Sequence, residues 1–182
     1  MEIDPILQRR VMGCFVTGVT LITTRYGEGD QIWGMTANSF TSLSLDPPLV
    51  LLTVDRRNAI YEYLLRGKCF AVNILSVDQE NISRQFANRG PKDFSAMNLT
   101  VAETGAPILV GALAYLDCRI VQNIRGGDHD IFIGELVACA MQDGQPLLFH
   151  GGRYGRLALS GSGALANGSE KLGEVFDLYG SF

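Results

Sequence analysis

The strongest constraint on the fold is a series of short β-branched segments that do not alternate regularly with helices. Val19 to Thr24 and Ile32 to Thr36 are two such segments, and the Gly-rich run between them predicts a hairpin. Further strands are predicted over Leu49–Val54, Phe70–Leu75, Ala112–Val121, Ile131–Met141 and Pro146–His150. A parallel sheet would need a crossover helix between successive strands. The pattern therefore predicts a mainly β protein with attached helices, built as a Greek-key barrel.

Helices are predicted where start and stop signals bracket an apolar face. The predicted ranges are Asp4-Pro5 to Gly13, Asn58 to Leu65 before Gly67, and Ser76 to Phe86. In the last range Ser76 and Gln79 have the spacing of a capping box. The two long strands are expected to be joined by a wide connection over Gln122 to Asp130.

The chain is expected to form one domain over residues 1–157, followed by a tail over residues 158–182. Leu159 to Gly168 is rich in Ser, Gly and Ala, a composition typical of linkers. Glu170 to Tyr179 places apolar residues on one side of a predicted short helix. This helix is expected to dock on the barrel or on a partner subunit.

Composition and charge exclude several functions. The chain is 47% hydrophobic and 19% charged, which suits a folded core and argues against intrinsic disorder. Its net charge of −4 disfavours a nucleic-acid partner, since phosphate neutralisation needs an excess of Lys and Arg. The longest apolar run near the middle, Leu49 to Leu52, is far too short to cross a bilayer, so no membrane is expected.

The cysteines and histidines give no sign of a metal centre. Four cysteines lie far apart without a C-x-x-C pair, at Cys14, Cys69, Cys118 and Cys139. The two histidines do not cluster with them, so no metal site is expected. The start of the chain lacks the apolar core of a signal peptide. We therefore expect reduced thiols that fill the core of a cytoplasmic protein.

The usual nucleotide and hydrolase motifs are absent from the sequence, which contains no G-x-G-x-x-G after a strand, no P-loop and no G-x-S-x-G. A Rossmann domain is thereby excluded, and polar stretches remain as candidate sites. The first contains Thr36, Ala37, Asn38 and Ser39, whose short side chains and amides could bind the edge of a planar heteroaromatic ring. The alternative is an ordinary Ser/Thr-rich turn.

The second candidate stretch is Asp55-Arg56-Arg57-Asn58, between a predicted strand and a predicted helix. Guanidinium groups beside a helix N-terminus make a good phosphate site. The alternative is a pair of solvated surface arginines.

The third candidate stretch is Asp128-His129-Asp130, at the start of a predicted strand. Flanking carboxylates should favour the charged imidazolium, and the histidine could reach a ligand at the barrel rim. Arg153 and Tyr154 add a cation and an aromatic ring after Gly151-Gly152. The alternatives are a turn histidine and a surface pair.

Six segments taken together resemble the short-chain flavin reductases, of the flavin reductase-like family with an FMN-binding split barrel. The segments are Thr17–Thr20, Gly34–Phe40, Ser44–Val50, Phe70–Ser76, Gly127–Glu135 and Gly152–Tyr154. They span Gln8 to Leu157, and the tail from Ala158 departs from the family pattern. The resemblance implies a split β-barrel of Greek-key type.

The resemblance also implies a set of site residues. Flavin would contact Thr36, Ala37, Asn38 and Ser39 through its ring edge and ribityl chain, and Asp55, Arg56, Arg57 and Asn58 around its phosphate. Phe86 and Arg89 would make secondary contacts to the flavin or its adenylate. His129 would face the nicotinamide as the catalytic histidine, with Arg153 and Tyr154 lining the same opening. Hydride transfer needs alignment rather than an obligatory acid or base.

The activity implied is hydride transfer from NADH or NADPH to FMN or FAD, which supplies reduced flavin to a separate monooxygenase component. Two alternatives stay open because fold does not fix function. One is a flavin-binding or electron-transfer module of the same fold, and the other is an oxidase with tightly held FMN. Exposed sheet edges and a half-formed site favour a homodimer over a monomer.

Overall fold

The computed structural model describes residues 3–27, 31–88 and 90–158. Its helices are α1 (Pro5–Met12), α2 (Ile60–Gly67) and α3 (Glu80–Ala87), with a 3-10 turn η1 (Val77–Gln79). Its strands are β1 (Thr17–Gly18), β2 (Thr20–Arg25), β3 (Ile32–Ala37), β4 (Phe40–Leu45), β5 (Pro48–Asp55), β6 (Cys69–Ile74), β7 (Leu99–Thr100), β8 (Ile108–Leu109), β9 (Ala114–Gly126), β10 (His129–Met141), β11 (Leu148–His150) and β12 (Arg153–Gly155).

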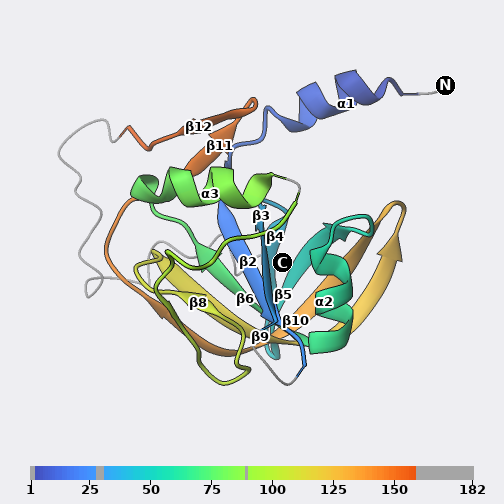
Figure 1. Ribbon diagram of the computed structural model, residues 1–182. Coiled ribbons are helices and arrows are strands. Elements are labelled where there is room, and N and C mark those ends of the chain that lie inside the picture. The colour runs from blue at the N-terminus through green and yellow to red at the C-terminus, as the bar shows by residue number, and fades with distance from the viewer. Residues whose placement is uncertain (1–2, 28–30, 89, 159–182) are drawn as a thin grey trace.

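One antiparallel sheet dominates the molecule, with strand order β3-β2-β6-β9-β10-β5-β4 (Figure 1). Its outer strands β3 and β4 are consecutive in the chain and are joined by Asn38 and Ser39. Ser39 Oγ donates to the carbonyl of Thr53 in β5 at 2.8 Å, and the Thr53 amide donates to the Ser39 carbonyl at 3.3 Å. These two hydrogen bonds connect the β3–β4 link to β5 and close the barrel there. Elsewhere β3 and β5 do not pair with each other, so the barrel stays open between them. This is a split barrel, which confirms the predicted fold class.

The barrel interior follows from alternation along the strands. Val50, Leu52 and Val54 of β5 are buried while the residues between them are partly exposed. They pack with Phe132 of β10 in the main hydrophobic core. Gly134 of β10 permits this packing, because a Cβ there would lie 2.6 Å from the ring of Phe70. The Phe70 ring, which comes from β6 on the far side of β9, therefore requires glycine at this position of β10.

The three helices predicted within the described residues are present, and the range predicted from Ser76 begins as the 3-10 turn η1 before α3. Asp4 caps α1 by accepting from the Ile6 amide at 2.9 Å, with Pro5 in the first turn. Ser76 and Gln79 form the capping box, and the Ser76 amide donates to Gln79 Oε1 at 2.9 Å. The α3 helix covers one side of the barrel and packs a second core against it, as the green helix above β2 shows (Figure 1).

The wide connection predicted over residues 122–130 is wrong. Strands β9 and β10 pair as far as Gly126 and His129, so only Gly127 and Asp128 form the turn. Gly127 has φ +69°, a conformation typical of two-residue hairpin turns and open to glycine. Strands β1, β4, β7, β8 and β12 were not predicted from the sequence, and all of them except β4 have only two or three residues.

The cysteine prediction is half right. Cys69 and Cys118 are buried as expected, whereas Cys14 and Cys139 are exposed. All four cysteines are free thiols. Among the described residues, no helix has both the length and the apolar character needed to span a membrane. The predicted linker and C-terminal helix of the tail lie outside the described residues.

Candidate functional site

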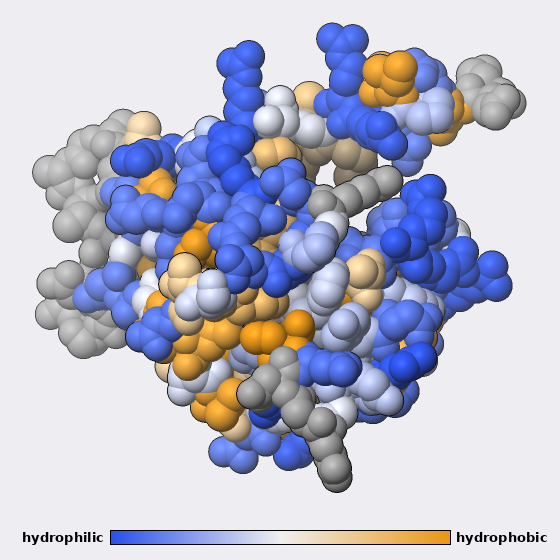
Figure 2. Space-filling view, in the orientation of Figure 1, coloured by the Kyte–Doolittle hydropathy of each residue, from blue (hydrophilic) through white to orange (hydrophobic). Residues whose placement is uncertain are grey.

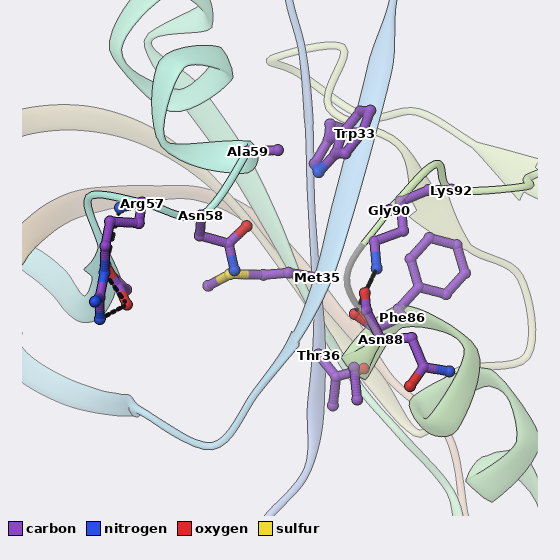
Figure 3. A pocket seen from close by; sticks show the side chains of 12 residues that line it. Trp33, Met35, Thr36, Arg57, Asn58, Ala59, Phe86, Asn88, Gly90 and Lys92 are labelled. Atoms are coloured by element: carbon purple, nitrogen blue, oxygen red, sulfur yellow. Dashed lines mark hydrogen bonds and ion pairs between the residues drawn. The ribbon is translucent and has the colours of Figure 1, made fainter.

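A cavity of about 350 Å³ opens in the gap of the split barrel (Figure 3). Its lining comes from β3, from the β5–α2 connection, and from the end of α3 with the loop that follows. The lining residues are Trp33, Met35, Thr36, Asp55, Arg57, Asn58, Ala59, Phe86, Ala87, Asn88, Gly90 and Lys92. The volume lies within the range of small-molecule sites. The opening of the barrel therefore contains a candidate site for a small molecule.

The structure brings five of the predicted site residues together in this cavity: Thr36, Asp55, Arg57, Asn58 and Phe86. Arg56 is placed elsewhere, although it was predicted beside Arg57. Its Nη2 donates to the Gly127 carbonyl at 2.7 Å, and its Nε lies 4.0 Å from Asp130. The side chains of Arg56 and Arg57 diverge, so the predicted pair of guanidinium groups facing one phosphate is not formed.

Ala37, Asn38 and Ser39 do not line the cavity. The Ala37 carbonyl accepts from Thr20 Oγ1 at 2.8 Å, and Asn38 Nδ2 donates to Thr17 Oγ1 at 3.2 Å. The Ser39 hydroxyl is bonded to β5 as described above. Ser39 therefore links the β3–β4 connection to β5, whereas the Ala37 carbonyl is bonded to β2 and the Asn38 side chain to β1.

Asp55 and Arg57 form a tight ion pair at one end of the cavity, drawn with dashed lines in Figure 3. Arg57 Nη2 lies 2.8 Å from Asp55 Oδ2, and Arg57 Nε lies 3.0 Å from Asp55 Oδ1. This hydrogen bonding holds the pKa of the Asp55 carboxyl well below its usual range and raises the pKa of Arg57. The guanidinium charge of Arg57 is therefore largely neutralised within the protein.

His129 lies at the rim, where β10 begins opposite Asp55 of β5. Its Nδ1 is 2.7 Å from a carboxylate oxygen of Asp128, and this hydrogen bond lowers the pKa of Asp128. The prediction that Asp130 also flanks the imidazole is wrong, because adjacent strand residues point to opposite faces. Asp130 is buried and accepts from the Tyr61 hydroxyl at 2.7 Å. With Nδ1 occupied, Nε2 is the nitrogen left to meet a ligand.

Tyr154 is connected to the cavity wall through α3. Its hydroxyl is 2.8 Å from Ser83 Oγ, and the Ser83 carbonyl accepts from Thr36 Oγ1 at 2.7 Å. Arg84 stacks on the Tyr154 ring at 4.7 Å. Arg153 is exposed on β12, outside the cavity lining. Arg89 lies outside the described residues.

The sequence analysis missed two cavity residues with chemically useful groups, Trp33 and Lys92. Trp33 stacks on Tyr63 with ring centroids 5.2 Å apart, and its buried Nε1 has no hydrogen-bond partner. Lys92 Nζ donates to the Phe86 carbonyl at 3.1 Å and also to the Asn88 carbonyl. One feature of the sequence could have pointed to Trp33 as a site residue. It is the one tryptophan of the chain and directly precedes the Gly34–Phe40 segment.

A split β-barrel with an aromatic and polar cavity in its gap defines a class of β-barrel proteins that bind small ligands. Residues 12–158 match the flavin reductase like domain, and the chain belongs to that family. This confirms the resemblance inferred from the six sequence segments.

Individual relatives agree with this assignment. The chain is 41% identical over 161 residues to an NADH-dependent FAD reductase of Streptomyces globisporus, covering 85% of this chain and 87% of that protein. It is 37% identical over 153 residues to the HsaB reductase subunit of a flavin-dependent monooxygenase from Rhodococcus jostii, covering 84% and 77%. A solved structure of the NADH:FAD oxidoreductase SgcE6 of S. globisporus C-1027, in complex with NAD and FAD fragments, superposes with a TM-score of 0.80 at 40% identity. The superposition covers 87% of this chain and 97% of the chain in that structure.

Proposed function

We propose that this protein is an NADH-dependent flavin reductase that supplies reduced flavin to a separate monooxygenase component. The observation that carries the proposal is the cavity in the barrel gap, which combines the aromatic side chains of Trp33 and Phe86 with several polar and charged groups. Relatives that are an NADH-dependent FAD reductase and an NADH-dependent FMN reductase support the same reaction. The reductase subunits among the relatives support a monooxygenase as the recipient of the product.

The cavity residues fit a flavin. Phe86 and Met35 offer apolar contact to a planar ring, and the buried Trp33 Nε1 is a hydrogen-bond donor without an acceptor. Asn58 Oδ1 accepts from the Ile60 amide at 3.2 Å, which leaves the Asn58 amide nitrogen to donate into the cavity. The flavin ring carries several hydrogen-bond acceptors, which can accept from these two donors.

The role of the protein in such a reaction is binding and alignment. Flavin, when bound, provides a ring that can accept a hydride. The titratable residues of the lining are Asp55, Arg57 and Lys92, and Asp55 and Arg57 are engaged with each other. Their pairing lowers the pKa of Asp55 and raises the pKa of Arg57, which moves both away from neutrality, in keeping with a hydride transfer that depends on geometry.

Dialysed protein is expected to oxidise NADH only when FAD or FMN is added, because flavin acts as a substrate in the proposed reaction. The measurement is the loss of NADH absorbance at 340 nm, with and without each flavin. Heat-denatured protein is the control. If the protein keeps a full complement of flavin through dialysis and does not oxidise NADH with excess flavin, a flavin-storage or electron-transfer role replaces this proposal.

We also propose that the protein is a homodimer, on the basis of the uncovered helix α1. No residue of α1 is buried, and the helix stands apart from the barrel beside β11 and β12 (Figure 1). Its apolar side chains are visible at the upper right of Figure 2. Val11 of α1 and Phe15, which follows the helix, are 60% and 73% exposed. Exposed apolar side chains of this kind gain free energy by packing on a second copy.

Gel filtration at micromolar concentration is expected to give about 40 kDa, twice the 19.8 kDa of one chain. The Val11→Asp, Phe15→Asp double variant is expected to elute near 20 kDa, since charges would be buried in the interface. Val101→Asp is a matched control, because Val101 is an exposed apolar residue beside β7, away from α1. A wild-type protein that elutes as a monomer would refute the dimer.

A further inference from the structure

Asp130 is a buried carboxylate near the start of β10 that does not line the cavity. It lies directly opposite Val54 of β5, a core residue, whereas the preceding residue His129 lies opposite Asp55, which lines the cavity. Directly opposed residues of antiparallel strands share a face of the sheet, so Asp130 points to the face of Val54 and His129 to the face of Asp55. A buried charge is unfavourable unless it is paired.

The partners of Asp130 come from the connection between β5 and α2 and from the first turn of α2. The Tyr61 hydroxyl donates to Asp130 Oδ2 at 2.7 Å, and this hydrogen bond raises the pKa of Tyr61. Asp130 Oδ1 is buried and has no hydrogen-bond partner in the described chain, and Arg56 Nε lies 4.0 Å from it. Arg56 and Tyr61 therefore approach one carboxylate from the two ends of the connection.

Arg56 also ties this connection to the β9–β10 turn, whose tip lies beside it (Figure 1). Its Nη2 donates to the Gly127 carbonyl at 2.7 Å, and its amide donates to the Asp128 carbonyl at 3.3 Å. His129 lies in the chain between these turn residues and Asp130. The backbone that carries the imidazole is therefore held on both sides by contacts to the β5–α2 connection.

The cavity side of the same connection has hydrogen bonds of its own. The Arg57 amide donates to Asp55 Oδ1 at 2.9 Å, and the Asn58 amide donates to the Asp55 carbonyl at 2.8 Å. These bonds are local and do not involve Asp130. Loss of the Asp130 contacts should therefore disturb His129 more than it disturbs the residues that line the cavity.

We infer that Asp130, through Arg56 and Tyr61, positions His129 at the rim of the cavity. The inference rests on the proposed function, in which His129 meets the nicotinamide. Asp130 is a positioning residue in this account, because its carboxylate is buried away from the cavity. Hydride transfer depends on alignment, so a small displacement of a group that orients the nicotinamide lowers the rate.

The kinetic test is Asp130→Asn, which keeps an oxygen for Tyr61 and removes the charge beside Arg56. NADH turnover at saturating FMN is expected to fall about fivefold, with FMN affinity within about twofold of the wild type. Asp117→Asn is the matched control. Asp117 is a second buried carboxylate, accepts from the Thr104 amide at 2.8 Å and is outside the cavity lining. Folded Asp117→Asn protein is expected to keep wild-type turnover even where its stability is lower.

The double variant His129→Asn, Asp130→Asn tests whether Asp130 acts through His129. If it does, adding Asp130→Asn to His129→Asn is expected to lower turnover by less than about twofold, because the positioned group is already absent. Single effects that multiply in the double variant would show that Asp130 influences the rate without His129, which overturns the inference.

Histidine ring signals in an NMR spectrum of the untagged protein give a measurement that needs no activity. The chain has two histidines, so His150→Asn assigns the signals of His129 by elimination. Tyr61→Phe removes one hydroxyl and leaves the charge of the protein unchanged. It is expected to shift the His129 signals and to leave those of His150 in place, whereas Asp117→Asn is expected to shift neither.

The outcomes keep the inference apart from the proposed function. Unchanged His129 signals in Tyr61→Phe, or wild-type turnover in folded Asp130→Asn protein, overturns the inference. If Asp130→Asn does not fold, the signals and the turnover of Tyr61→Phe decide in its place. Wild-type protein that oxidises NADH with neither flavin refutes the proposed function, and shifted His129 signals in Tyr61→Phe would still support the positioning of His129.

Discussion

Replacing Gly67 by alanine is expected to lower the free energy of unfolding by about 3 kcal/mol or more. A Cβ on Gly67 would lie 2.1 Å from the carbonyl oxygen of Arg25 and 3.2 Å from Thr24 Oγ1. The first contact is with the backbone of β2, which cannot move aside as a flexible side chain could. The end of α2 would have to separate from the barrel, with loss of buried contacts by Leu64. Urea unfolding followed by circular dichroism measures the change.

Gly18→Ala is the matched control for this substitution. A Cβ on Gly18 meets nothing within 4 Å, so its stability is expected to stay within about 0.5 kcal/mol of the wild type. The connection before α2 also carries Asp55, Arg57 and Asn58 into the cavity. Any Gly67→Ala protein that remains folded should therefore bind FMN more weakly. A variant as stable as Gly18→Ala would show that α2 does not pack closely on β2.

Gly67 also shows that a local sequence signal can predict where a helix ends without giving the physical reason. The predicted helix ended at Leu65 with Gly67 as its stop signal, and the observed helix ends two residues later, at Gly67 itself. In the structure, however, Lys68 takes the left-handed conformation with φ +56°. Gly67 is required instead by the close approach of β2, a strand far away in the sequence. The glycine in the sequence was enough to predict approximately where α2 ends. The reason that this position requires glycine is the tertiary packing of α2 on β2.

Elements with complete local signals were predicted with nearly correct bounds. The Asp4 cap and the Ser76 capping box act within a few residues, so their geometry is encoded where it occurs. The β9–β10 turn was misjudged, because Gln122 to Arg125 have no apolar alternation of their own. Their pairing with β10 is what keeps them in a strand. Long-range pairing of this kind cannot be inferred from a single strand.

The candidate site was predictable only in part for the same reason. Thr36 and Asn58 stand in polar stretches, and the folded barrel brings them into one cavity. Trp33 stands in a predicted strand and Lys92 in a polar loop without a recognisable motif, and only the fold places them on the same cavity. Arg56 and Arg57 are adjacent in the sequence, yet their side chains go to different partners, Gly127 and Asp55. Because the two arginines are adjacent, the sequence predicted that both would face one phosphate. In the β5–α2 connection, however, their side chains point to different partners.

His129→Asn is expected to lower NADH turnover at saturating flavin about tenfold, equivalent to about 1.4 kcal/mol of activation free energy. His129 lies on the rim beside Asp55, with 44% of its side chain exposed. Its Nδ1 is fixed by Asp128 at 2.7 Å, so the imidazole presents Nε2 in a set direction. We expect this group to position the nicotinamide rather than to supply a required proton. Asparagine can still bond to Asp128, but it is too short to offer a group at the position of Nε2.

Steady-state kinetics with NADH varied at saturating FMN measure the effect, and a flavin titration without NADH measures binding. Flavin affinity is expected to change much less than turnover, because His129 is outside the cavity lining. His150→Asn is the matched control, since His150 is the other histidine and lies exposed on β11. Unchanged kinetics in His129→Asn would leave His129 as a surface residue of the turn. Complete loss of turnover with intact flavin binding would instead identify an obligatory proton donor, because lost alignment alone reduces the rate without abolishing it.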